Sequence, residues 1–213
     1  MIRLVNFLLL LGKSPQYNKE IINKGLTPQI VYKLCSCIRE TFCLSYSIRK
    51  ENNLFLYFQK EHILISFIGT ELRYLGPDER SQALLLEKAL NKANKTNLSV
   101  NEVRKQSTPG IYFNKFWDDK SFKNYLNSHF SEEFALIIKN HSSLPTIKDF
   151  EDIKLITEFF YIIPIDLITK NKLNLIQMII ESDKITLIKI PKANSSNDKI
   201  LYINFKADKF HCL

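Results

Sequence analysis

A run of ionisable side chains and two glycines follows a predicted buried strand in the first half of the chain. It reads F-I-G-T-E-L-R-Y-L-G-P-D-E-R, from Phe67 to Arg80. Glu71 and Asp78 are carboxylates that could act as acids at a catalytic site. A structural role is the alternative for Asp78, because a carboxylate suits the first turn of a helix that we expect to begin at Pro77.

Basic residues outnumber acidic ones, with 30 Lys and Arg against 22 Asp and Glu and a formal net charge of +8. Such an excess suits a polyanionic partner such as RNA. We expect phosphate contacts from the arginines and the lysine that flank the predicted elements of the first half, namely Arg39, Arg49, Lys50, Arg73 and Arg80. The alternative is a solvated basic surface without a partner.

Cysteines and histidines form no pattern that is typical of a metal site or a disulfide framework. Cys35 and Cys37 lie two residues apart on a predicted helix, where their side chains point to different faces. No second cysteine pair and no matching histidine spacing accompany them. We therefore expect no metal, and reduced thiols in a cytoplasmic protein. No segment approaches membrane-spanning length, so no membrane partner is expected.

Predicted strands and helices alternate along the chain. Strands are expected at 2–10, 54–59, 62–68, 134–138 and 159–163, and helices at 28–42, 77–93, 118–130 and 169–182. This alternation indicates a mainly parallel sheet with helices on both faces. Near the end, two apolar runs at 185–190 and 200–205 flank A-N-S-S-N-D, a pattern typical of a β-hairpin. We expect a domain at 1–182 and a C-terminal hairpin extension at 183–213.

Three motifs together resemble one enzyme family: the run from Phe67 to Arg80, S-T-P-G-I-Y from Ser107 to Tyr112, and L-C-S-C-I from Leu34 to Ile38. With these, the chain is similar to the archaeal and bacterial enzymes that N1-methylate a pseudouridine in the T-loop of tRNA. The resemblance implies an α/β fold of the SPOUT class with a C-terminal trefoil knot. It also implies S-adenosylmethionine as cofactor, tRNA or another structured RNA as substrate, and a homodimer.

The resemblance further implies where the cofactor would bind, at loops that follow strands in the second half of the chain. Lys139 and Asn140 stand where the family has Gly and Asp in a Gly-Asp-His segment, and Lys172 stands where it has Cys. The other cofactor segment corresponds to the residues from Ile162 to Leu167. The implied cofactor-binding residues are Lys139, Ile162, Ile163, Pro164, Ile165, Asp166, Leu167 and Lys172.

Departures from the family leave two functional hypotheses open. Lys139 adds positive charge beside a positively charged sulfonium, and Ile30 and Tyr32 replace the Arg and Asp of a Gly-Arg-x-Asp motif. The first hypothesis is an S-adenosylmethionine-dependent tRNA pseudouridine N1-methyltransferase whose catalytic residues are unassigned beyond Glu71 and Asp78. The second is a catalytically inactive relative that keeps the fold to bind RNA or a partner subunit.

Overall fold

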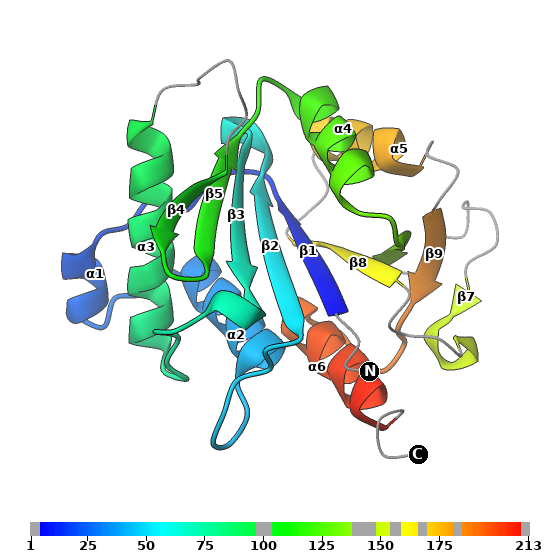
Figure 1. Ribbon diagram of the computed structural model, residues 1–213, viewed down its shortest axis with the longest axis horizontal. Coiled ribbons are helices and arrows are strands. Elements are labelled where there is room, and N and C mark those ends of the chain that lie inside the picture. Colours follow the sequence, from blue (N-terminus) through cyan, green and yellow to red (C-terminus); the bar gives the residue numbers. More distant parts are fainter. Residues whose placement is uncertain are drawn as a thin grey trace.

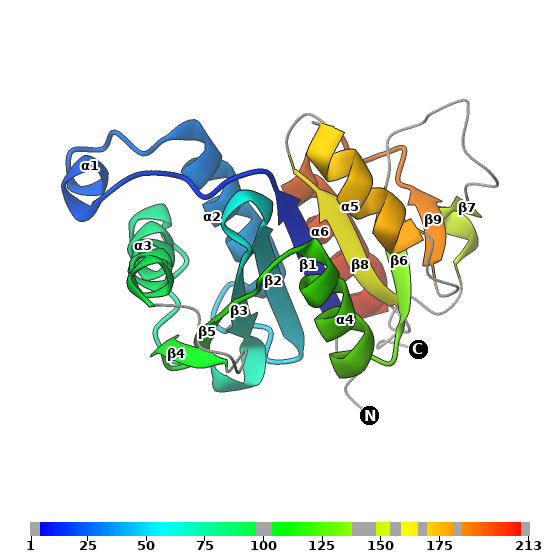
Figure 2. The same ribbon diagram turned by 90° about the horizontal axis from the view of Figure 1, so that it is seen from above.

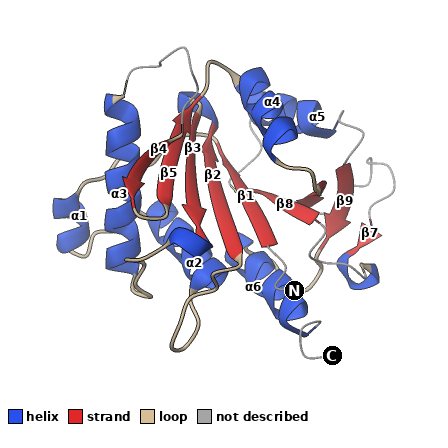
Figure 3. Cartoon of the chain, viewed as in Figure 1, coloured by secondary structure: helices blue, strands red, loops and turns tan. Residues whose placement is uncertain are grey.

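The computed structural model describes residues 5–96, 104–137, 148–153, 159–165, 170–180 and 185–209. These residues include a nine-stranded sheet of order β4-β5-β3-β2-β1-β8-β6-β9-β7, with helices on both faces (Figures 1 and 3). The strands are β1 Val5–Leu11, β2 Asn52–Phe58, β3 Ile63–Ile68, β4 Lys105–Thr108, β5 Ile111–Lys115, β6 Glu133–Ile137, β7 Lys148–Asp149, β8 Phe159–Pro164 and β9 Ile185–Lys189.

Six α-helices and three short 3-10 turns accompany the sheet in the described part of the chain. They are α1 Lys19–Asn23, α2 Gln29–Phe42, η1 Gln59–Glu61, η2 Gly69–Glu71, α3 Glu79–Lys95, α4 Asp119–His129, η3 Phe150–Asp152, α5 Lys170–Ile180 and α6 Ser196–Lys209. One core lies between the sheet and α2, α3 and α6, and a second lies between the sheet and α4 and α5. Helix α1 flanks α3 at the outer end of the molecule (Figure 2).

Strand β1 occupies the centre of the sheet, between β2 and β8, and pairs with both in parallel. All seven of its residues, VNFLLLL, are buried. A continuous apolar run of this kind fits a parallel strand that is covered on both faces. The pairs of β6 with β8, of β6 with β9 and of β7 with β9 are also parallel. The predicted mainly parallel sheet with helices on both faces is therefore confirmed.

The parallel strands give the sheet two chemically different edges. We call the edge where β1, β2, β6, β8 and β9 end the carboxyl edge, and the edge where they begin the amino edge. Strand β3 runs antiparallel to β2, so it starts at the carboxyl edge and finishes at the amino edge. The segment that follows β3, including Glu71 and Asp78, therefore begins at the amino edge.

The C-terminal segment differs from the predicted hairpin. Its first half is a strand, β9, which lies between β6 and β7 in the main sheet. Its second half is the helix α6, so the expected second strand at 200–205 is wrong. Ser195 and Asp198 cap that helix reciprocally, with Ser195 N donating to Asp198 Oδ2 at 3.1 Å and Asp198 N donating to Ser195 Oγ at 3.2 Å. The S-S-N-D pattern is thus a capping box rather than a hairpin turn.

Other predicted boundaries agree to within a few residues, as expected where helix ends fray. Helix α3 begins at Glu79 with Asp78 as its N-cap, so the prediction that Pro77 is the first helical residue is wrong. The segments that would form a trefoil knot include 138–147 and 166–169, which lie outside the described residues. The division into 1–182 and 183–213 stays a prediction.

Among the described residues, no helix is long and apolar enough to cross a membrane. The same residues contain no group of three or more His, Cys, Asp or Glu side chains placed to hold a metal ion. Cys35 and Cys37 are buried free thiols on α2, and burial raises the pKa of each to about 12. Thiols with such a pKa stay protonated and inert near neutral pH.

Candidate functional site at the carboxyl edge

Strands β1 and β8 lie side by side, but the chain leaves them toward opposite faces of the sheet. The helix that packs after β1 is α2, on one face, and the helix after β8 is α5, on the other. In open α/β sheets, ligands bind in the crevice beyond the carboxyl ends of the two strands at such a topological switch point. Ile165 N donates to Leu10 O at 2.9 Å, which fixes the end of β8 against β1.

The candidate cofactor segment enters this crevice with its main chain rather than with its aliphatic side chains. Ile162 is buried in the core under α4 and α5, whereas Ile163 and Ile165 are buried in the core under α2. Pro164, at the end of β8, is only partly buried. The three isoleucines therefore belong to the two cores, and Ile165 N is already bonded to Leu10 O, so these residues support the segment from within.

Four candidate cofactor residues lie outside the part of the segment described so far. Lys139, Asp166 and Leu167 lie outside the described residues. Lys172 belongs to α5, the first helix after the crevice. The structure therefore tests the position of the cofactor segment on the sheet, and not its side-chain contacts.

Hydrogen bonds join the loop after β1 to the β2–β3 turn at the same edge. Lys60 N donates to Gly12 O at 2.9 Å, and Ser14 N donates to Glu61 Oε2 at 2.9 Å. Since the other side of β1 is joined to β8, these bonds make one continuous rim from the candidate cofactor segment to the β2–β3 turn.

A cluster of polar side chains lies on this rim, and we call it the Asp119 cluster: Tyr57, Gln59, His62 and Asp119. Tyr57 O–H donates to Asp119 Oδ1 at 2.8 Å, and Gln59 Nε2 donates to Asp119 Oδ2 at 2.7 Å. His62 Nδ1 lies 3.1 Å from the Tyr57 oxygen and 3.4 Å from Asp119 Oδ1. Both carboxylate oxygens of Asp119 are thus held by neutral donors beside an imidazole.

Local structure fixes each member of the Asp119 cluster. Asp118 and Ser121 form a capping box that starts α4 and positions Asp119 at its first residue. The Tyr57 ring stacks on Phe122, with the ring centroids 3.6 Å apart and the ring planes 4° from parallel. Burial, followed by the nearby Asp119 charge, raises the pKa of Tyr57, so its hydroxyl stays protonated.

Sequence reasoning missed this cluster because its members come from separate elements. Tyr57 is the next-to-last residue of β2, Gln59 opens η1, His62 precedes β3, and Asp119 opens α4. The spacing of the histidines in the sequence matches no metal-site pattern. The only signal available was a predicted helix start near Asp119, and this does not point to His62.

The two candidate catalytic carboxylates lie elsewhere, beyond the amino edge. Glu71 is exposed, accepts a hydrogen bond from the Tyr112 hydroxyl and lies 3.9 Å from Arg104 Nη2. Asp78 accepts a hydrogen bond from Ser81 N at 2.8 Å, and this bond holds the pKa of Asp78 below its usual range. The structure does not bring either carboxylate together with the candidate cofactor segment.

Two glycines of the same motifs are required by close packing at the amino edge. A Cβ atom on Gly69 would lie 2.3 Å from the carbonyl oxygen of Asn52. Gly110 has φ +80°, and a Cβ atom there would lie 2.4 Å from Leu72 N. Both contacts are with backbone, which cannot move aside. These motifs therefore specify the corner where β3, η2 and the β4–β5 turn meet.

Arg49 and Lys50, two of the five candidate phosphate contacts, have partners within the protein. Arg49 makes a bidentate ion pair with Asp208 of α6, with nitrogen–oxygen distances of 2.5 and 2.8 Å. Lys50 Nζ donates to Leu72 O at 2.7 Å. To bind a phosphate, Arg49 or Lys50 would have to give up its partner within the protein.

The other three candidates lie closer to solvent. Arg80 Nε and Nη2 donate to Asn23 Oδ1 at 3.2 and 3.0 Å on an exposed surface. Arg39 Nε lies 3.5 Å from Glu40 Oε1. Arg73 is exposed, in the segment between η2 and α3. These three are open to an external anion with little loss of internal bonding.

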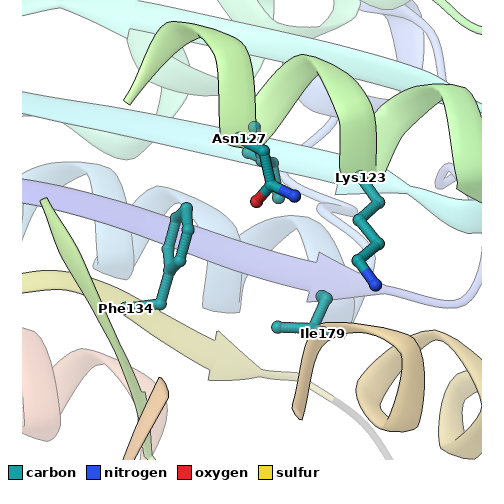
Figure 4. A pocket seen from close by; sticks show the side chains of 5 residues that line it. Lys123, Asn127, Phe134 and Ile179 are labelled. Carbon is teal, nitrogen blue, oxygen red and sulfur yellow. The ribbon is translucent and has the colours of Figure 1, made fainter. Parts of the chain in front are cut away.

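A small hollow lies on the opposite face from α2, between α4, α5 and the start of β6 (Figure 4). Lys123, Leu126, Asn127, Phe134 and Ile179 line it. Its volume of about 10 Å³ is close to the minimum for one water molecule. It is too small for a nucleotide.

The fold resembles that of one solved structure over almost the whole chain. The crystal structure of Archaeoglobus fulgidus Nep1 bound to S-adenosylhomocysteine matches with a TM-score of 0.51, covering 98% of this chain and 95% of that one. The sequences are 12% identical. This likeness shows a shared α/β fold and nothing about the ligand of the present chain.

A family comparison then identifies the chain. Residues 30–144 match the family model described as "Putative SAM-dependent RNA methyltransferase". This match covers more than half of the 213 residues, and the chain therefore belongs to that family. The matched region includes α2, the amino-edge motifs, the β2–β3 turn and α4.

Curated relatives share part of this region. The tRNA (pseudouridine(54)-N(1))-methyltransferase of Methanocaldococcus jannaschii is 39% identical over 82 residues, which is 37% of this chain and 40% of that protein. The enzyme of the same name from Methanococcus maripaludis strain C6 is 29% identical over 124 residues, 55% and 56% of the two chains. The match spans about two-fifths to just over half of these relatives' length.

Proposed function

We propose that the protein transfers a methyl group from S-adenosylmethionine to structured RNA, at N1 of a pseudouridine in tRNA. Family membership and the pseudouridine methyltransferases among its relatives support this reaction class. The structural observation that carries the proposal is the β1/β8 switch point, because the segment that resembles the family's cofactor loop ends there.

S-adenosylmethionine supplies a methyl group on a positively charged sulfur when it is bound. The backbone around Pro164 would hold it at the crevice, with Asp166 and Leu167 following and with Lys139 and Lys172 on the neighbouring segments. Ile162, Ile163 and Ile165 keep that backbone rigid from within the two cores. We also propose that the family's trefoil knot forms in this half of the chain.

RNA would be held by the net positive charge and by phosphate contacts. Arg39, Arg73 and Arg80 are the best-placed candidates, since they are the more exposed. Arg49 and Lys50 would contribute mainly by fixing the surface around them. The protein is proposed to work as a cytoplasmic homodimer, as the resemblance implies.

A catalytically inactive RNA-binding relative is the second candidate function. The observation that favours it is the pair Lys139 and Asn140, which replaces Gly and Asp in the cofactor segment. A lysine near the sulfonium disfavours the donor by charge repulsion. This alternative predicts tight RNA binding without affinity for the donor.

Calorimetry with S-adenosylmethionine and S-adenosylhomocysteine, followed by a methylation assay, tests the proposal. The substrates would be two tRNA transcripts that differ only in uridine or pseudouridine at the T-loop position. We expect micromolar donor binding and methylation of the pseudouridine transcript alone. RNA binding with no donor binding up to millimolar concentration would instead establish the inactive relative.

A further inference from the structure

His62 has a backbone conformation that is uncommon for a non-glycine residue. It is the sole non-glycine residue with positive φ in the described ranges, at φ 49° and ψ 41°. Glycine adopts this left-handed region without strain, whereas other residues pay a cost there. A residue that keeps such a position against glycine often has a use for its side chain. The Asp119 cluster indicates what that use is.

The hydrogen bonds of the cluster determine which His62 nitrogen carries the proton. Tyr57 has one hydroxyl proton, and it is donated to Asp119 Oδ1 at 2.8 Å. The Tyr57 oxygen must therefore accept at its 3.1 Å contact with His62 Nδ1, which makes Nδ1 the protonated nitrogen. In neutral imidazole the other nitrogen, Nε2, then carries the free lone pair. Burial keeps Tyr57 protonated, so this arrangement persists at neutral pH.

The His62 ring has an acceptor nitrogen, Nε2, and lies between a carboxylate and solvent. An imidazolium formed there would lie beside the Asp119 carboxylate, 3.4 Å from Nδ1. The side chain of His62 is 32% exposed, so the ring is reachable from outside. Trp117, two residues before Asp119, is 60% exposed and offers a flat surface on which a nucleobase can stack.

The cluster also lies close enough to the crevice to share one substrate with it. His62 precedes β3, which is three places from β8 in the sheet order. Three strand spacings correspond to roughly 14 Å. The span matches a nucleoside-sized donor together with an acceptor base, and the Gly12–Lys60 and Ser14–Glu61 bonds keep the rim between them rigid.

We propose that His62 is the proton acceptor for the nucleobase nitrogen that receives the methyl group. This inference rests on the proposed function. As the nitrogen–methyl bond forms and the donor's carbon–sulfur bond breaks, the N–H proton passes to His62 Nε2. The donor leaves as a neutral thioether. Tyr57 and Asp119 are positioning residues, since they act through the imidazole.

The first test needs neither donor nor RNA. Nitrogen-15 NMR of the histidine side chains, with His62→Gly to assign the signal, reports the tautomer at pH 8. The geometry predicts Nδ1–H with a bare Nε2 for His62. An Nε2–H tautomer would overturn the proposal, because that nitrogen could not then accept a proton.

The second test uses His62→Gly, which removes the ring and suits the backbone. We expect an unchanged or higher melting temperature and a single-turnover methylation rate at least 10²-fold lower. Added imidazole should restore part of this rate in the glycine variant and not in wild type, which a merely structural histidine would not show. His62→Asn, which also tolerates the left-handed region, should be equally slow without rescue. A glycine variant with the wild-type rate would refute the proposal.

A pH profile separates the positioning residues from a purely structural cluster. The titratable groups around His62 are Tyr57, Glu61, Asp118 and Asp119. Only a neutral imidazole can accept the proton, so the rate of the wild-type enzyme should be lost under acid conditions. Asp119→Asn should move this loss along the pH axis, whereas a cluster that only supports the fold would leave it in place. An unmoved acid limb in Asp119→Asn would contradict the role of Asp119.

Failure of this inference is distinguishable from failure of the proposed function. If wild type transfers no methyl group to either transcript, the proposed function fails and His62 has no such reaction to serve. If wild type is active and His62→Gly is equally active, only the assignment of His62 fails.

Discussion

The two edges of the sheet are built for different purposes. At the amino edge, Gly69 and Gly110 allow backbone segments to touch, and Asp78 is bonded as a helix cap. At the carboxyl edge, the chain leaves β1 and β8 toward opposite faces of the sheet, and the Asp119 cluster carries an imidazole beside a carboxylate. Two of the three motifs that resemble the family, Phe67–Arg80 and Ser107–Tyr112, lie at the amino edge. Sequence likeness in this chain therefore reports a scaffold more clearly than it reports chemistry.

The largest expected effect is on stability at the amino edge. Gly69→Ala and Gly110→Ala force a Cβ atom to within 2.3 and 2.4 Å of backbone. Each should destabilise the fold by about 3 kcal/mol or more, measured as the free energy of unfolding in urea. Gly25→Ala is the matched control: Gly25 has φ +70° but no atom within 4 Å of its Cβ position, so a loss of only about 1 kcal/mol is expected. Equal losses of unfolding free energy in Gly25→Ala and Gly69→Ala would contradict the role of close backbone packing at the amino edge.

The next effect concerns the bidentate pair that ties the amino edge to α6. Arg49→Lys keeps the charge but loses the two parallel bonds to Asp208, and should cost about 1 kcal/mol of unfolding free energy. The exposure of Asp208 moderates this cost through solvent screening. Lys24→Arg, at an exposed site just after α1, serves as a control for the effect of substitution itself. A double-mutant cycle with Asp208→Ala showing no coupling would contradict the pair.

Substitutions of Asp78 test whether an amino-edge carboxylate serves the fold or the reaction. Asp78→Ala should lose about 1 kcal/mol through the missing cap, while Asp78→Asn should lose a few tenths at most. Both variants should methylate RNA at close to the wild-type rate. If the Asp78→Asn protein is stable but its methylation rate is 10²-fold lower, Asp78 has a catalytic role.

The smallest effect is the pH dependence of α6 docking. Hydrogen bonds from Lys206, Tyr202 and Lys192 lower the pKa of Glu151 to about 2, against 4.5 for the unperturbed group. A lowered folded-state pKa stabilises the protein above pH 4.5, and this contribution is lost as the pH falls toward 2. The protection factors of the α6 amides, which correct for the slower intrinsic exchange at lower pH, should therefore fall between pH 4.5 and 3. Glu151→Gln should remove this pH dependence; an unchanged profile in that variant would exclude Glu151 as its cause.

Local signals predicted most of the scaffold. The predicted strand at 2–10 and the predicted helices at 28–42 and 118–130 lie close to β1, α2 and α4, and the alternation of strands and helices predicted the parallel sheet. The structure of the segment around Ser195 could not be predicted from its sequence, because S-S-N-D fits a hairpin turn and a capping box alike. The Asp119 cluster was missed since strand pairing, rather than sequence spacing, brings His62 to Asp119.

The central claim, that the methyl donor binds at the carboxyl edge, has one direct test. Backbone amide shifts on titration with S-adenosylhomocysteine should concentrate at Gly12–Ser14, at Lys60–His62 and at the residues from Ile162 onward. Amides at Gly69–Asp78 and Ser107–Gly110 should remain unshifted. Shifts confined to those amino-edge motifs would contradict the account.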